Sequence, residues 1–251
     1  MSVHWYKMKT GECAYTTIGA NGLERDTTLR DARKHGYVPS VTTIISGAAS
    51  PGLDMYLQTQ LLNAAISVYA GDKTEEEWRR AVVKESREHS KKAAEAGSKI
   101  HDALEHYYLG ENPTGDMLKI ITPVVNFMKQ EFGYLHWRPE RSFGSNLGFG
   151  GKVDMSYSSD DGERCIILDF KTKATSDIKK MIPYDQHHMQ TAAYAVGLDM
   201  PHADRYNLFI STETPGLINL TKSDNFERDW GMFEALLKYW QLKNKYNPGV
   251  E

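Results

Sequence analysis

The sequence has few cysteines and lacks a long apolar run. Cys13 and Cys165 are the only two cysteines among 251 residues, which excludes a disulfide framework and any metal site built on paired cysteines. No apolar run is long enough to cross a bilayer. The first residues have neither the apolar core of a signal peptide nor the composition of a transit peptide. We therefore expect a protein of the reducing cytoplasm with no membrane partner, and a buried, structural Cys165.

An excess of one charge is also lacking, because the formal net charge is −3. The chain as a whole therefore has no basic surplus of the kind that marks many nucleic-acid-binding proteins. Lysines nevertheless cluster: four of them oppose one acid, Asp177, between Lys171 and Lys180. A helix expected over about 84–99 carries another basic group. The simpler interpretation of these lysines is a helix face exposed to solvent. Beside an active site, the same lysines would follow a phosphate backbone.

No repeat, low-complexity tract or linker divides the chain, so we expect one domain over 1–251. In its first part, 1–135, residues 4–38 look β-like around the turn Asn21-Gly22. Helices are expected there at about 51–69, 74–108 and 117–132. The second part, 136–251, contains strand-like runs around 137–172 and 204–222, and helices at about 184–198 and 225–245. This order predicts an α/β fold with a central mixed sheet flanked by helices and a helical N-terminal half.

The segment IILDFKTK, residues 166–173, ends an apolar strand with two charges. Asp169 and Lys171 share one face of that strand, while Phe170 points to the other face and into the core. The preceding strand carries Asp154 and is joined by the turn SDDGE, so Asp154 and Asp169 are expected to face each other. Facing carboxylates repel unless a cation lies between them. Oxygen ligands of this kind suit Mg²⁺ or Mn²⁺.

Asp154 followed by Asp169-Phe170-Lys171 resembles the signature of the PD-(D/E)xK nuclease superfamily, and GKVD…DFKT resembles its RecB-like branch. Two helical motifs add to this resemblance. Gly97 and His101 resemble the GxxxH helix of the branch, and Gln190 and Tyr194 resemble its QxxxY motif. Taken singly, each has a simpler interpretation as the edge of a core. Together they follow the family order over about residues 90–200.

The resemblance implies a restriction-endonuclease-like core and Mg²⁺-dependent hydrolysis of DNA, with Mn²⁺ substituting. It implies a metal held by His101, Asp154, Asp169 and the backbone carbonyl of Phe170. Lys171 is then expected to orient water or offset negative charge, with Gln190 and Tyr194 touching the substrate or holding Lys171. Products would carry 5′-phosphate and 3′-hydroxyl ends. Glu140 and Glu105 are candidates for a supporting acid behind the metal ligands. Two cysteines exclude the four-cysteine iron–sulfur variant.

The segment VPSVTTIISG resembles the PSVT element of the mitochondrial genome maintenance exonucleases and related phage exonucleases. Ser40, Thr42 and Thr43 start a helix there, which suits a phosphate, although an ordinary N-cap is an equal interpretation. The resemblance favours an exonuclease acting on free, single-stranded DNA ends in the cytoplasm, or the host cytoplasm if a phage encodes it. Replication or recombination proteins are possible partners. An endonuclease of the same fold and a non-catalytic DNA-binding module are the alternatives. The expected DNA contacts are Ser40, Thr42, Thr43, Lys91, Lys92, Lys99, Lys173 and Gln186.

Overall fold

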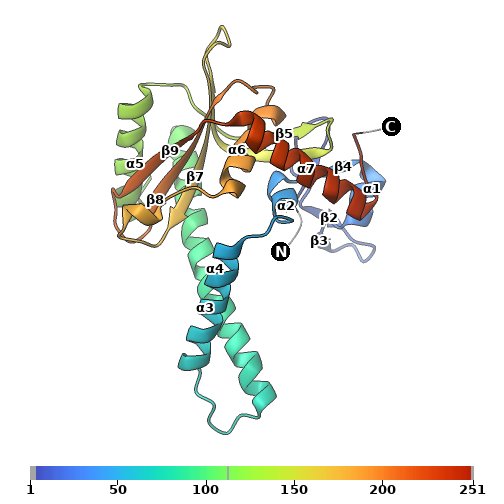
Figure 1. Ribbon diagram of the computed structural model, residues 1–251, viewed down its shortest axis with the longest axis vertical. Helices are drawn as coiled ribbons and strands as arrows, with labels where there is room; N and C mark the ends of the chain where they lie inside the picture. The colour runs from blue at the N-terminus through green and yellow to red at the C-terminus, as the bar shows by residue number, and fades with distance from the viewer. Residues whose placement is uncertain (1–3, 112, 250–251) are drawn as a thin grey trace.

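The computed structural model describes residues 4–111 and 113–249. A body built around one sheet carries a long helical arm that projects away from it (Figure 1). None of the helices in the described ranges is long and apolar enough to cross a membrane.

The central sheet has the strand order β5-β6-β7-β8-β9. Strands β7 and β8 run parallel, and the other neighbours are antiparallel, so the predicted mixed sheet is confirmed. The parallel pair needs a crossover, which helix α6 (Asp185–Gly197) supplies. Strand β7 is the middle strand, which explains its apolar sequence. The strand bounds are Arg138–Ser145, Phe149–Ser158, Cys165–Lys173, Asp204–Ser211 and Ile218–Ser223.

Helices cover both faces of this sheet. Leu168 and Phe170 of β7 pack against helices α4 (Glu75–Tyr108) and α5 (Met117–Phe132). Ile167, which directly precedes Leu168 in sequence, packs on the opposite face with α2 (Val41–Ile45), α6 and α7 (Phe226–Asn244). Cys165 is buried on that second face. Alternate residues of β7 thus serve two cores, and the helices predicted for these segments are confirmed.

The first forty residues are less purely β than predicted. Short strands pair as β1 (Trp5–Lys7) with β4 (Tyr37–Pro39), and as β2 (Thr16–Ile18) with β3 (Glu24–Asp26) around the predicted turn. Between them lies a helix, α1 (Leu29–His35), which the β-like interpretation of 4–38 missed. Thr28 and Asp31 form a capping box that starts this helix. That Thr-x-x-Asp pattern was visible in the sequence.

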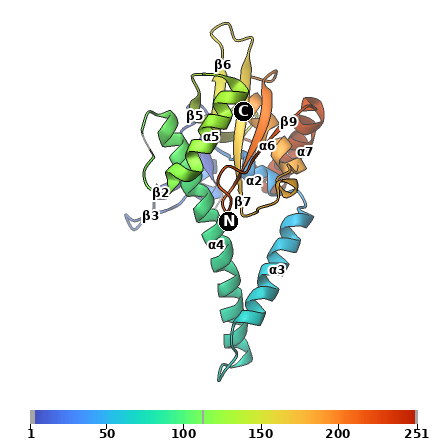
Figure 2. The same ribbon diagram turned by 90° about the vertical axis from the view of Figure 1, so that its left-hand side faces the viewer.

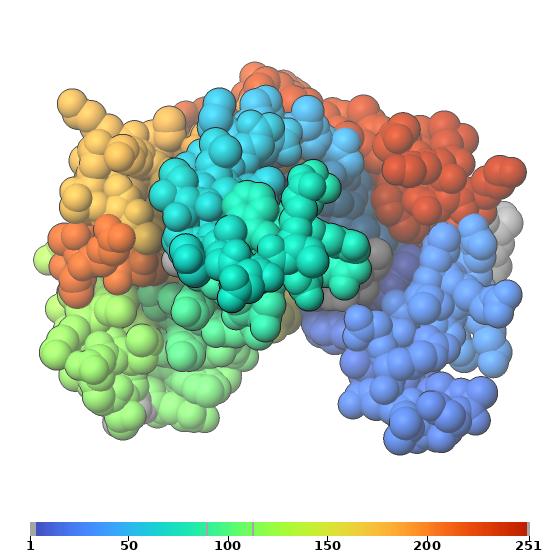
Figure 3. Space-filling view, turned by 90° about the horizontal axis from the view of Figure 1, so that it is seen from below, coloured from blue at the N-terminus to red at the C-terminus, as the bar shows by residue number. Residues whose placement is uncertain are grey.

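The arm consists of α3 (Pro51–Ser67) and the first half of α4. The two helices run side by side, meet at the far end of the arm and separate toward the body (Figures 1 and 2). Thr74 and Glu77 form the predicted capping box of α4. Seen from below, the arm lies over the middle of the molecule (Figure 3). The second half of α4 continues from the arm into the body, so one helix joins both parts.

Candidate active site

The candidate site lies where strands β6 and β7 separate. Their antiparallel ladder ends at the pair Met155–Leu168, and the next pair in this register is Asp154 with Asp169. Beyond that pair a side chain replaces the backbone partner: Asp154 Oδ2 accepts a hydrogen bond from the backbone N–H of Phe170 at 2.7 Å. The two carboxylates therefore lie at the point of divergence, on the central strand pair.

The strand that carries Asp154 bends at this point. Val153 and Met155 pack in cores on opposite faces of the sheet, although residues two apart in a regular strand share a face. On the neighbouring strand, Glu140 has a left-handed backbone with φ 49°. Its carboxylate pairs with Lys152, and within the described ranges no hydrogen bond or ion pair joins it to Asp154. Glu140 is thus part of the bend. Within the described ranges, no such interaction with Asp154 supports its predicted role as an acid behind the metal ligands.

Helix α4 approaches strand β7 closely at Gly97. A Cβ atom at this position would lie 2.6 Å from Thr172 Oγ1, so any larger residue would force the contact to shift. One turn later, His101 Nδ1 lies 3.3 Å from Asp154 Oδ1, and its ring meets the Phe170 ring edge-on. The spacing of Gly97 and His101 therefore has a local cause. Glycine permits the contact, and the histidine one turn on reaches the carboxylate.

Asp169 is buried and has two partners. Its Oδ2 lies 2.6 Å from Lys171 Nζ and accepts a hydrogen bond from Asn207 Nδ2 at 3.1 Å. Burial raises the pKa of Asp169; the Lys171 ammonium opposes this rise, and the Asp154 charge adds to it. For His101, burial lowers the pKa, but the hydrogen bond to Asp154 and the nearby carboxylates outweigh burial and raise it overall. The site therefore concentrates negative charge in a place with little water.

Helix α6 holds Lys171 from the side. Gln190 Oε1 accepts a hydrogen bond from Lys171 Nζ at 2.9 Å, and Gln190 Nε2 donates to Tyr194 Oη at 2.7 Å. Burial raises the pKa of Tyr194 well above its ordinary value, so its hydroxyl stays neutral. A Cβ atom on Gly151 would lie 3.0 Å from the Tyr194 ring, so this glycine of the GKVD segment makes room for the tyrosine. The GKVD segment and the QxxxY motif are thus in contact, and Gln190 of the QxxxY motif also holds Lys171.

The donor chemistry of the site fits a hard cation. Mg²⁺ prefers oxygen ligands and often takes only one or two carboxylates, with water in the remaining positions. Asp154 and Asp169 offer such oxygens. Among residues 4–111 and 113–249, however, no three His, Cys, Asp or Glu side chains are arranged to hold a metal ion. The predicted ligand set of His101, Asp154 and Asp169 is adjacent but not assembled, because each member contacts a protein group.

The predicted phosphate site at Ser40 is an N-cap in the structure. Ser40 Oγ accepts a hydrogen bond from the Thr43 N–H at 3.0 Å and contacts both threonine hydroxyls. Thr42 alone of the three lines a cavity beside the candidate site, together with Lys173 and Gln186. Lys173 Nζ donates to the Lys180 carbonyl at 2.6 Å. The ordinary capping interpretation thus accounts for Ser40 and Thr43.

The lysines of α4 do not join this cavity. Lys91 lies near Glu95 at 3.8 Å, and Lys92 and Lys99 line a separate hollow between α4 and α5. Glu105 lies one turn after His101, and its backbone carbonyl accepts an ordinary helical hydrogen bond from the Leu109 N–H. Lys92 and Lys99 thus line a different cavity from Lys173, and the contact of these lysines with DNA stays a prediction.

Sequence reasoning missed Asn207 and His187. Asn207 is fully buried in β8 and lies beside Asp169 in the parallel register. The single amide directly before the apolar residues Leu208–Ile210 of this strand was the available signal. His187 lines the cavity next to Gln190, and its Nδ1 accepts a hydrogen bond from the Tyr184 N–H at 3.1 Å. Its position follows from the helix start alone, which the sequence had placed correctly.

Comparisons with known proteins add little to this site. No protein-family model matches the chain, and no curated protein matches it. Among solved structures, the crystal structure of SSO0001 is similar at a TM-score of 0.37 and 14% identity. The match covers 79% of this chain and 89% of that one. A likeness of this size carries no argument about function.

Proposed function

We propose that the chain is a metal-dependent DNA exonuclease of the RecB-like PD-(D/E)xK type, with a restriction-endonuclease-like core. The observation that carries the proposal is the placement of Lys171. Its ammonium is held between Asp169 and Gln190, beside Asp154, at the end of the central strand. The four motifs of the family resemblance thus supply side chains to one place.

In this proposal Asp154 and Asp169 hold Mg²⁺, with the Phe170 carbonyl and His101 as further donors. An ion held there would supply an activated water and would stabilise charge on the phosphate. Lys171 is fixed by two partners and keeps 22% of its side chain exposed, so its ammonium is positioned to offset negative charge on an entering phosphate. Gln190 sets the direction of Lys171, and neutral Tyr194 sets the direction of Gln190.

The preference for DNA ends rests on the family resemblance and on the arm. Helices α3 and α4 stand over the middle of the molecule and separate toward the body (Figures 2 and 3). The cavity at the start of α3, beside Lys173 and Gln190, suits a flexible single strand better than a stiff duplex. The expected partner is therefore a single-stranded DNA end, with the cavity residues Thr42, Lys173 and Gln186 near its backbone.

The test is digestion of end-labelled linear single-stranded DNA and of closed circular single-stranded DNA, each with Mg²⁺ or with EDTA. Wild type is compared with Lys171→Ala and with the control Lys222→Ala on β9. We expect Mg²⁺-dependent loss of the linear strand alone, abolished in Lys171→Ala and retained in the control. Cutting of circles would favour the endonuclease alternative. Binding without cutting would favour a non-catalytic DNA-binding module.

A further inference from the structure

A cavity of about 700 Å³ lies beside the candidate site, between α6 and the start of the arm. Two of its lining residues connect it with that site. Gln190 holds Lys171, and Lys173 follows Lys171 two residues further along β7. The cavity therefore begins one side chain away from the proposed position of the scissile phosphate.

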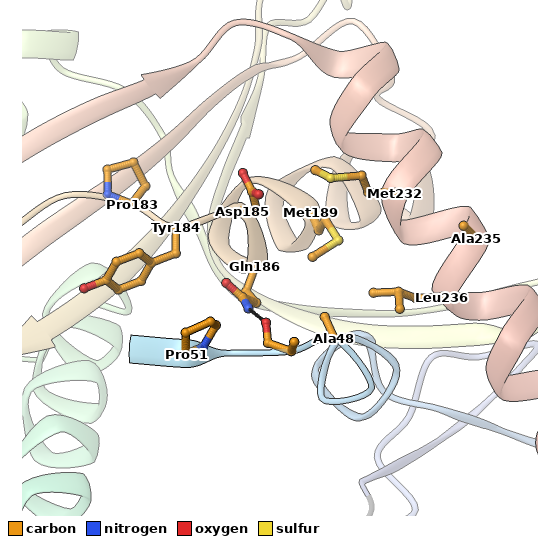
Figure 4. A pocket seen from close by; sticks show the side chains of 11 residues that line it. Ala48, Pro51, Pro183, Tyr184, Asp185, Gln186, Met189, Met232, Ala235 and Leu236 are labelled. Atoms are coloured by element: carbon orange, nitrogen blue, oxygen red, sulfur yellow. Dashed lines mark hydrogen bonds between the residues drawn. The ribbon is translucent and has the colours of Figure 1, made fainter. Parts of the chain in front are cut away.

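The cavity presents aromatic and apolar surface. Tyr184 and Tyr56 line it and are 50% and 41% exposed. Pro51 and Leu53, at the start of α3, also line it. Figure 4 shows a neighbouring pocket that shares Pro51, Tyr184 and Gln186 with this cavity, and in it Tyr184 extends from the start of α6 on the side where Pro51 lies. Exposed aromatic faces of this kind are the surfaces on which proteins stack unpaired bases.

The frame of the cavity is held by hydrogen bonds. Gln186 Nε2 donates to the Ala49 carbonyl at 2.9 Å, which ties α6 to the segment between α2 and α3 (Figure 4). Nδ1 of His187 accepts from the Tyr184 N–H, and the His187 ring packs on Phe209 at 5.7 Å. Burial, aided by the charge of Lys171, lowers the pKa of His187 to about 3, so this wall is neutral at ordinary pH.

Two charged side chains line the cavity, Lys173 on β7 and Asp54 on α3. Lys173 Nζ uses one N–H on the Lys180 carbonyl, and an ammonium has three. Asp54 is the acidic side chain in the cavity lining. A cation beside an aromatic cavity matches the two halves of a nucleotide: a phosphate for the lysine and a base for the rings.

We propose that this cavity is a subsite for one unpaired nucleoside of the DNA strand, next to the scissile phosphate. The inference rests on the proposed nuclease function and adds the reason for a preference for single strands. A base in a duplex must first leave its stack and its partner, which costs free energy. Because every base has an aromatic face, stacking on Tyr184 predicts little dependence on base identity.

The test measures binding of the full chain, at low salt with EDTA, to fluorescein-labelled oligo(dT) in which one abasic position is moved along the strand. Wild type is compared with Tyr184→Ala and Tyr184→Phe. The matched control is Tyr239→Ala on α7, whose tyrosine is 53% exposed. We expect Tyr184→Ala to weaken binding about tenfold, with Tyr184→Phe and the control near wild type. The tenfold loss should disappear when the abasic site occupies one particular position.

Equal losses in Tyr184→Ala at every abasic position would overturn the subsite, because the ring would then not meet a defined base. The same strands cut in Mg²⁺ provide the second readout, as a position-specific change in cutting rate. If wild type cuts normally but no position couples to Tyr184, the subsite fails and the nuclease proposal stands. If wild type neither binds nor cuts DNA, both fail together.

Discussion

Two buried ion pairs in this molecule differ in how completely they are satisfied. Arg205 and Asp229 lie 3.0 Å apart with side chains 2% and 3% exposed, and Arg205 also donates to the carbonyls of His188 and Ser223. Asp169 and Lys171 lie 2.6 Å apart, but Lys171 reaches solvent. The first pair is closed, in that neither side chain reaches solvent, and the second is open, in that its lysine does.

The two pairs also differ in how well the residues around them are hydrogen-bonded. Asn207 donates to Asp169, yet its own Oδ1 is buried and has no hydrogen-bond partner among residues 4–111 and 113–249. Such an atom costs free energy unless something else satisfies it. A closed pair stabilises one arrangement of the helix and sheet around it. An open pair with an unsatisfied neighbour is instead typical of a site where stability is lost in favour of function.

The difference between the two ion pairs is tested most directly by replacing the aspartate of each pair, Asp169 and Asp229, with asparagine. Asp169→Asn removes a charge whose burial is unfavourable, so we expect unchanged or increased stability. We also expect loss of Mg²⁺-dependent cutting by roughly 10³-fold, or about 4 kcal/mol. Thermal unfolding and initial cutting rates measure the two effects. A strongly destabilised Asp169→Asn protein would show that this pair serves the fold as well.

Asp229→Asn is expected to act in the opposite way. It leaves the buried Arg205 guanidinium without its carboxylate and should lower the free energy of unfolding by about 3 kcal/mol. The cutting rate per folded molecule should stay near wild type, because Asp229 lies outside the candidate site. Urea denaturation gives the stability. The double variant Arg205→Met/Asp229→Leu should recover part of the loss, since no charge is then left unpaired.

Asn207→Ala tests whether the buried amide positions Asp169. We expect cutting to fall about tenfold, about 1.4 kcal/mol, and the Mg²⁺ concentration for half-maximal rate to rise. The matched control is Asn219→Ala on the next strand, whose amide donates to the Met181 carbonyl at 2.7 Å. An equal shift in the Mg²⁺ requirement of both variants would assign the effect to the sheet and not to Asp169.

The smallest effect is expected at an exposed pair. Lys222 and Asp204 lie 2.7 Å apart, with side chains 45% and 50% exposed, and water screens their attraction. Lys222→Ala should change the free energy of unfolding by less than about 1 kcal/mol. A larger change in urea denaturation would mean that exposure is a poor guide to the strength of ion pairs in this protein.

Much of the fold follows from local patterns. The apolar strand at 166–168, the capping box at Thr74 and the turn at Asn21-Gly22 are confirmed because short-range geometry decides them. The helix at Leu29–His35 was missed although Thr28 and Asp31 mark its start. The strand period predicted that Asp169 and Lys171 share a face, and the family resemblance predicted that Asp154 and Gln190 join them, as the contacts of Lys171 and Phe170 show.

The sequence by itself thus determined the α/β order of elements and the residue types gathered at the central strand. Tertiary structure alone decided that β6 leaves the ladder at Asp154, that Asn207 supports Asp169, and that Glu140 pairs with Lys152. It also placed Lys92 and Lys99 in a hollow with α5 residues, and Lys173 in a different cavity beside α6. The physical reason is distance along the chain: these contacts join segments whose relative position depends on packing between layers, which no local period encodes.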